Sequence, residues 1–339
     1  MKKILRSKNF TLILILIVLI AVFSFWSSRL GKNFFATSTI KNVLQAIIVT
    51  GFLTIGAGCL LISGNMDIAM SAIGCLGLTV IGNACAKGIP GIVALIMMFI
   101  ICGLFGLLDG WLVSVMKFPS FIATMGVSFI VKGLTYVYSQ WWNNGVATNV
   151  NFKDKFIQWF GTTSLFGIPI GAYILILFFL FYGIMISKTR FGMKMLLVGG
   201  NAQAARLAGI NATKVVITLF VNGSILAGIS GLFQGSRLGM AGLTALSTNQ
   251  FTGLTAAMIG GISFGGGIGG MGGALIGLLI LNTFQIGMSV VGVNPYWVTT
   301  FSGVLLLGAL SIDFLKMRVA SNKLARQRRK EVKEAGKNA

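Results

Sequence analysis

The run AYILILFFLFYGIMI, residues 172–186, contains no charged side chain, and a second apolar run, VVITLFVNGSILAGISGLF, occupies residues 215–233. Runs of this kind are typical of helices that cross the hydrocarbon core of a bilayer, which takes roughly 20 residues. Between them lies the polar, alanine-rich stretch GGNAQAARLAGINATK, residues 199–214, which carries Arg206. The sequence therefore predicts two membrane-spanning helices that are joined by a polar segment whose purpose needs an explanation.

The composition extends this interpretation to the whole chain. Hydrophobic residues make up 55% of the 339 residues, charged residues make up 10%, and only 6 residues are acidic, whereas a soluble domain is about 25% charged. This predicts an all-α, polytopic integral membrane protein. The net charge of +21 does not indicate a nucleic-acid partner, because the basic residues are scattered among apolar runs, as in the cytoplasmic loops of membrane proteins.

The residue types also limit the chemistry. The chain has no histidine, and its 4 cysteines show no CxxC spacing. This excludes Ser-His-Asp and Cys-His catalysis, and it predicts neither a zinc site nor a disulfide. We therefore expect that the chain is not an enzyme, that it holds no metal or cofactor of its own, and that its cysteines are small core residues.

Ten spans are predicted from the apolar runs, near residues 10–26, 43–63, 68–86, 92–116, 121–141, 170–187, 215–238, 253–264, 272–290 and 297–314. The eighth of these is too short to cross a bilayer unaided. The first resembles a signal peptide, but no A-x-A cleavage site follows it, which favours an uncleaved anchor. Residues 1–315 are predicted to form one transmembrane domain, followed by a basic cytoplasmic tail, residues 316–339.

The orientation follows from the positions of the basic residues. With both termini in the cytoplasm, most of the 27 Lys and Arg residues fall on the cytoplasmic side, as the positive-inside rule requires. The polar stretch from residue 199 is then cytoplasmic. The longest outer loop, residues 142–167, contains NNG and Asp154 and is expected to be a solvated surface.

The polar stretch itself has the signals of a short helix. Asn201 is a favourable N-cap, residues 202–208 are strong helix formers, and Gly209 can end the helix in the left-handed conformation. Ala204, Leu207 and Ala208 share one face by their i, i+3, i+4 spacing, and Arg206 points elsewhere. A helix of two turns does not hold itself together in water. It must dock on a surface, unless the stretch is an ordinary connecting loop.

A resemblance favours docking. The run RFGMKMLLVGGNAQAARLAGINATKV, residues 190–215, resembles the cytoplasmic coupling segment of the ribose-type sugar permeases of bacterial ABC importers. Its matching elements are Gly199, Gly200 and Asn201, then Ala204, Ala205, Arg206 and Leu207, with Ala208 after them, then Gly209, Ile210 and Asn211. The resemblance implies that this coupling segment, within residues 188–214, inserts into a groove of a separate ATPase subunit that carries ATP and Mg²⁺.

The likeness continues along the chain in five further runs: GLLDGWLV (106–113), FPSFIATMG (118–126), LAGISGLFQGSRLG (226–239), AAMIGGISFGGGIGG (256–270) and GVNPYW (292–297). It implies the ten-span plan of the vitamin B12 and siderophore permeases, working as a homodimer in the bacterial cytoplasmic membrane. It also implies an extracytoplasmic sugar-binding protein as a partner. The expected function is transport of a monosaccharide such as ribose, galactose or xylose by an ATP-driven importer.

Two departures from the family pattern concern the cargo more than the fold. The junction usually written TGGIDLSVG is SGNMDIAMS here, residues 63–71, so that Asn65 and Ser71 replace glycines. The glycine-rich run carries Ile268 where an arginine is common. A nucleoside, a branched amino acid or autoinducer-2 therefore remain alternative cargoes, and an ion-coupled secondary transporter remains a second class of protein.

Charged residues inside spans are functional candidates because they are costly there. Asp67 is predicted to cap the third helix, and Asp313 is predicted to pair with Lys316. Asp109 and Lys132 are the other two. The glycine-rich run has no lysine in the position that a P-loop requires, so it predicts close helix packing or a broken helix along the pathway.

An uncharged sugar needs amides, hydroxyls and aromatic faces along its route. The candidate pathway residues are Asn65, Asp67, Phe118, Thr124, Tyr136, Gln234, Asn282, Gln285 and Trp297.

Overall fold

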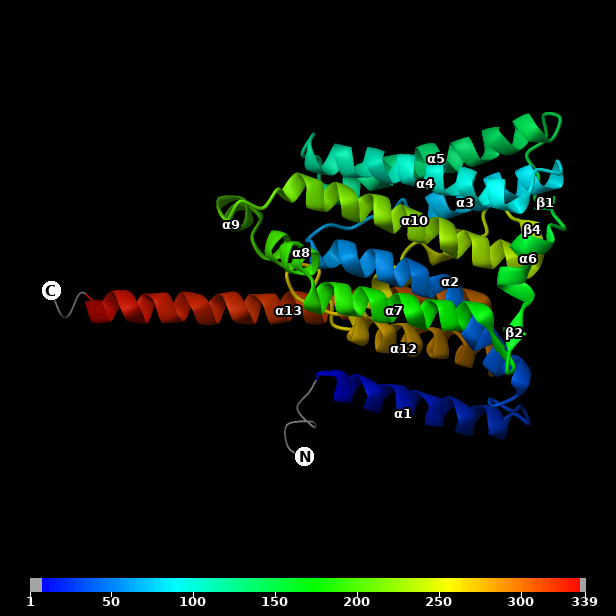
Figure 1. Ribbon diagram of the computed structural model, residues 1–339. Helices are drawn as coiled ribbons and strands as arrows, with labels where there is room; N and C mark the ends of the chain where they lie inside the picture. The colour runs from blue at the N-terminus through cyan, green and yellow to red at the C-terminus, as the bar shows by residue number, and fades with distance from the viewer. Residues whose placement is uncertain (1–7, 336–339) are drawn as a thin grey trace.

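The computed structural model describes residues 8–335 and is almost entirely helical (Figure 1). The helices are α1 (Lys8–Arg29), α2 (Thr37–Ile62), α3 (Met70–Ala86), α4 (Gly91–Ser114), α5 (Ser120–Trp142), α6 (Lys155–Thr162), α7 (Ile170–Lys188), α8 (Arg190–Gly200), α9 (Ala202–Leu207), α10 (Ala212–Leu238), α11 (Thr252–Ile259), α12 (Met271–Val290) and α13 (Pro295–Ala335), with a 3₁₀ turn η1 (Ser247–Asn249). The strands are β1 (Val150–Asn151), β2 (Ser164–Leu165), β3 (Ile168–Pro169) and β4 (Met240–Ala241). The predicted all-α polytopic fold is confirmed.

The core forms around α2 and α10. Helix α10 packs against α2, α3 and α4, and α2 also contacts α7, α11 and α12. Helix α2 is buried along most of its length, whereas α13 is not buried in its apolar part. Small residues permit this close packing: a Cβ on Gly106 of α4 would lie 2.7 Å from the Cα of Val221 in α10. The backbones of these two helices therefore approach one another closely, as is common in membrane proteins.

Among the described residues, eight helices are long and apolar enough to cross a membrane. The third and the eighth of the ten predicted spans form the two shorter helices α3 and α11. Helix α3 has 17 residues and is about 25 Å long at 1.5 Å per residue, and α11 has 8 residues and is about 12 Å long. The apolar runs at 68–86 and 253–264 predicted both helices, but the structure ends α11 at Ile259, before the predicted bound.

Each short helix is the helical part of an interrupted crossing. Residues 63–69 run without helix from the end of α2 to the start of α3, where Met66 N donates to Ser120 Oγ at 3.3 Å and Ile68 N donates to Thr124 Oγ1 at 3.2 Å. Residues 240–251 run mostly without helix from the end of α10 to α11. The backbone therefore passes ten times through the body within residues 8–335, twice by interrupted segments.

The two ends of the molecule differ (Figure 1). One end, the α9 end, carries α8 and α9, the start of α1 and the projecting part of α13; the other, the α6 end, carries α6 and the strands. Helix α13 continues without a break past residue 315, where a domain boundary was predicted, to Ala335. The basic residues before Lys8, which contribute to the predicted orientation, lie outside the described residues.

The loop at the α6 end is largely exposed, as expected, but it also has regular structure. Strand β1 pairs with β4, and β2 pairs with β3, both antiparallel. Helix α6 begins at Asp154, whose Oδ1 accepts from Ile157 N at 2.9 Å, and Ile157 and Phe152 are buried. The sequence did not predict α6, because an amphipathic helix of 8 residues is too short to give a clear periodic signal.

Candidate functional site

The segment that joins α7 to α10 folds as two short helices, α8 and α9. Asn201 caps α9, since its Oδ1 accepts from Gln203 N and Ala204 N, both at 3.0 Å. Gly209 has a φ of +78° and ends the helix. Asn211 in turn caps α10 through Lys214 N at 3.0 Å. The predicted N-cap and left-handed glycine are confirmed.

Helix α9 rests on its own chain by one side only. Ala205 is 3% exposed and Ile210 is half-buried, so a bulky residue at 205 would disturb the packing of the segment itself. Leu207 is 90% exposed, and Ala204, Arg206 and Ala208 are also exposed. An exposed leucine between exposed alanines at the tip of the molecule is an apolar surface that is open to a partner.

A joint of glycines ties this segment to both interrupted crossings. Gly267 N donates to Ile62 O at 2.8 Å. A Cβ on Gly266 would lie 2.6 Å from Gly199 O, and a Cβ on Gly267 would lie 2.7 Å from Gly200 Cα. The end of α2, the end of α8 and the loop after α11 therefore meet here without side chains between them. The first interruption begins at this joint, whereas α11 separates the joint from the second.

A groove of about 370 Å³ opens beside this joint. Ser63, Gly64 and Asn65 form one wall, and Gly199–Ala202 with Arg206, the start of α10 and the α4–α5 turn form the others. In the turn, Lys117 adopts a φ of +62° and its Nζ donates to Ser114 O. Of the described residues that line the groove, Lys117 and Arg206 are cationic and none is acidic. The groove therefore suits an anionic group.

Two buried carboxylates lie behind the groove. Asp67 is 4% exposed and its Oδ1 accepts from Ala69 N at 2.7 Å, whereas Asp109 in α4 is fully buried. The N-cap of α3 is Ala69, so the prediction that Asp67 is itself the cap needs correction: it binds the cap residue. Among the described atoms, Asp67 Oδ2 and both oxygens of Asp109 have no hydrogen-bond partner.

Asp313 has two partners that the sequence did not predict. Its Oδ2 accepts from Ser263 Oγ at 3.0 Å and from Phe264 N at 2.8 Å. It thereby anchors the loop after α11 to α13. The side chain of Lys316, the predicted partner, lies outside the described part of the structure.

Comparison with known sequences agrees with this architecture. The profile of a family described as "Branched-chain amino acid transport system / permease component" matches residues 39–310, which include both interrupted crossings, α8 and α9. The chain belongs to this permease family.

The chain aligns with curated permeases over most of its length. It is 29% identical to the ribose import permease protein RbsC of Bacillus subtilis over 289 residues, which are 84% of this chain and 88% of the relative. It is 28% identical to the fructose import permease protein FrcC of Rhizobium meliloti over 311 residues, 90% and 86% of the two chains. It is 28% identical to the L-arabinose transport system permease protein AraH of Escherichia coli over 306 residues, 89% and 90%. No solved structure matches the chain significantly.

In this permease, the candidate pathway residues do not meet in one cavity. Asn65 lines the groove at the α9 end. Thr124 and Asn282 are buried and bonded internally, Asn282 to Thr50 Oγ1 at 2.9 Å. The remaining candidates are spread over four helices and one turn. Phe118, Tyr136 and Trp297 are exposed, and Gln234 is half-buried. Gln285 Nε2 donates to Ser302 Oγ at 3.0 Å.

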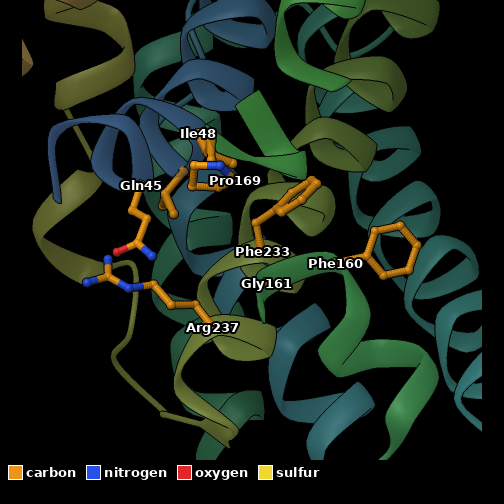
Figure 2. Close-up of a pocket in the computed structure, with 8 residues that line it drawn as sticks. Gln45, Ile48, Phe160, Gly161, Pro169, Phe233 and Arg237 are labelled. Atoms are coloured by element: carbon orange, nitrogen blue, oxygen red, sulfur yellow. The ribbon is translucent and has the colours of Figure 1, made fainter. Parts of the chain in front are cut away.

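A small hollow lies at the α6 end, opposite to α9 (Figure 2). Its volume is about 10 Å³, and its lining includes Gln45, Phe160, Pro169, Phe233 and Arg237. In Figure 2 the side chains of Gln45 and Arg237 point toward one another. Because this volume admits about one water molecule, the hollow is not a sugar site in this conformation.

Sequence reasoning missed two features that the structure brings together. Lys117, which lines the groove together with Arg206, was not among the predicted site residues. A second cavity lies between α3, α5 and residues 243–247, far apart in sequence. Nothing in the sequence signalled the second cavity, because its walls come from the interrupted crossings.

Proposed function

We propose that this permease is the membrane subunit of an ATP-driven importer that carries a monosaccharide. The observation that carries the proposal is the exposed apolar tip of α9, which is joined through glycine contacts to both interrupted crossings. The printed names of its relatives, import permeases for ribose, fructose and L-arabinose, support a sugar as the cargo.

The proposed coupling uses this chain's own residues. An ATPase subunit, which holds ATP and Mg²⁺, contacts Ala204, Leu207 and Ala208 and presents an acidic group to Arg206. Its closure moves α8 and α9, and the glycine joint passes that movement to residues 63–69 and to the loop after α11. Alternating access in transporters proceeds by such movements of one bundle of helices against another.

The remaining partners follow from the two ends of the molecule. We place the α9 end and both termini in the cytoplasm, because the exposed basic residues Lys188, Arg190, Lys194 and Lys214 lie in or beside α8 and α9, at that end. An extracytoplasmic sugar-binding protein then docks at the α6 end. A second copy of the permease completes the pathway as a homodimer in the bacterial cytoplasmic membrane.

The test is uptake into proteoliposomes that contain the permease with an ATPase and a sugar-binding protein encoded next to its gene. We expect ATP-dependent uptake of D-ribose, D-fructose or L-arabinose. The family description names branched-chain amino acids, so L-leucine is the comparison cargo, and uptake of leucine alone would contradict the sugar assignment. Uptake that follows an ion gradient without ATP would contradict the importer.

A further inference from the structure

The groove at the α9 end has the size and the lining of a site for a small solute. Its volume is about 370 Å³, and sites for small molecules typically measure about 300–1,000 Å³. Besides its two cations, the lining includes the amide of Asn65 and the hydroxyls of Ser114 and Thr213. Lys117 and Arg206 are exposed, so the groove is open to the aqueous phase.

The two cations of the lining are not neutralised by any described residue. Within residues 8–335, the guanidinium of Arg206 forms no ion pair and no hydrogen bond, and Nζ of Lys117 donates only to a backbone carbonyl, Ser114 O. A guanidinium carries five N–H donors and an ammonium three. Most of these donors are therefore available to a ligand, and both groups favour one that is negatively charged.

The buried carboxylates behind the groove do not cancel this charge. Asp67 and Asp109 do not line the groove, and Asp67 acts on Asp109 electrostatically. Two buried carboxylates that lie close together cannot both stay ionised, so at most one negative charge stands behind two positive charges. The start of α10, residues 212–213, also lines the groove and adds the positive end of a helix dipole.

The walls of the groove belong to the parts that the proposed coupling moves against one another. Residues 63–65 begin the first interrupted crossing, whereas residues 198–202 and Arg206 belong to the segment of α8 and α9. A ligand that contacts Asn65, Lys117 and Arg206 together fits only one relative position of these parts. Because a ligand shifts the population toward the conformation that it binds best, such a ligand would hold the segment in place.

From these observations we infer that the groove is a regulatory site for a small anionic solute that also carries hydroxyl groups, the class to which phosphorylated sugars belong. Lys117 and Arg206 bind the anionic group, and Oδ1 of Asn65 and Oγ1 of Thr213 bind the hydroxyls. Bound solute occupies Arg206, to which the ATPase is proposed to present an acidic group, and it thereby slows transport. This effect rests on the proposed function, whereas the binding itself does not.

The first test measures binding to the permease alone, by equilibrium dialysis of the full chain in discs of uncharged lipid. We expect D-ribose 5-phosphate to bind more tightly than D-ribose or inorganic phosphate. Lys117→Gln should weaken this binding by about fivefold or more, because a charge-assisted hydrogen bond is lost, and Lys117→Arg should retain it. Lys194→Gln is the matched control, since Lys194 in α8 is also exposed but does not line the groove.

Three outcomes of the dialysis would overturn the site. They are no binding of D-ribose 5-phosphate by the wild-type permease, equal binding by the wild-type permease and Lys117→Gln, and equal weakening in Lys117→Gln and Lys194→Gln. Displacement of the solute by added phosphatidylglycerol would assign the groove to a lipid headgroup and would contradict a soluble ligand.

The second test measures regulation in the complex with the ATPase and the sugar-binding protein. D-ribose 5-phosphate on the side of α9 should lower the initial rate of ATP-dependent D-ribose uptake by about threefold or more. Lys117→Gln should resist this inhibition and Lys194→Gln should keep it. Equal inhibition of the wild-type complex and both variants would place the effect on the ATPase and refute the regulatory role. A wild-type complex that takes up no sugar would refute the proposed function, and the dialysis would still decide the site.

Discussion

Asp67 shows how one side chain holds the first interrupted crossing in place. The segment before α3 has no helical hydrogen bonds of its own, so Ser120, Thr124 and Asp67 supply acceptors for three backbone donors, at residues 66, 68 and 69. A buried N–H left without an acceptor costs about 1–3 kcal/mol. The role of Asp67 is therefore to shape the junction, and the sugar does not need to contact it.

This predicts a difference between two substitutions. Asp67→Asn keeps an oxygen for Ala69 N, so the protein should fold but transport more slowly, because a neutral acceptor holds the junction less firmly than a carboxylate. Asp67→Ala removes the acceptor and should lower the free energy of unfolding by about 1–3 kcal/mol. Thermal unfolding and uptake of competing sugars are the measurements. A changed ranking of the sugars in Asp67→Asn would show that Asp67 recognises the cargo.

At the scale of elements, the helices differ in how well the sequence predicts them. Long apolar runs gave α1, α2, α4, α5 and α7, because burial in lipid demands them. Asn201 and Gly209 gave α9, because capping is local chemistry. The non-helical segments at 63–69 and 240–251 fall mainly in the breaks between predicted spans, since they carry polar residues such as Asn65 and Gln250. The sequence did not show that these segments run inside the protein, because their hydrogen-bond acceptors, such as Thr124 and Asn149, come from other parts of the chain.

A substitution in the glycine-rich loop after α11 should destabilise the fold. Gly269 has a φ of +142°, and a Cβ there would lie 2.9 Å from the Cα of Ile262. Gly269→Leu should therefore cost more than about 2 kcal/mol of stability and reduce the yield of folded protein in size-exclusion chromatography. Gly272→Leu is the control, because a Cβ at Gly272 meets no described atom within 4 Å. Equal yields of the two variants would show that the loop is not tightly packed.

At the scale of the whole molecule, we propose that the ATPase acts on a surface at one end of the permease. The glycine joint then passes the resulting movement to the membrane-spanning part. The apolar tip of α9 is at the α9 end, the glycine joint lies beneath it, and both interrupted crossings begin or end at that joint. The fold class and α9 were predictable from sequence. The joint and the cavity were not, because both arise from segments that are distant in sequence and meet only in the folded chain.

The most direct test of this account is the ATP hydrolysis rate of the complex, measured with and without loaded sugar-binding protein. The variant is Leu207→Glu, and its matched control is Leu165→Glu, at an exposed position of the α6 end. Both changes place a charge on an exposed surface and should alter the stability of the permease by less than about 0.5 kcal/mol. We expect Leu207→Glu, like the bulkier Ala208→Trp, to abolish stimulation of hydrolysis while the permease still inserts and dimerises, and Leu165→Glu to keep it. Wild-type stimulation in both Leu207→Glu and Ala208→Trp would contradict the account, because α9 would then be a connector and not the site where the ATPase acts.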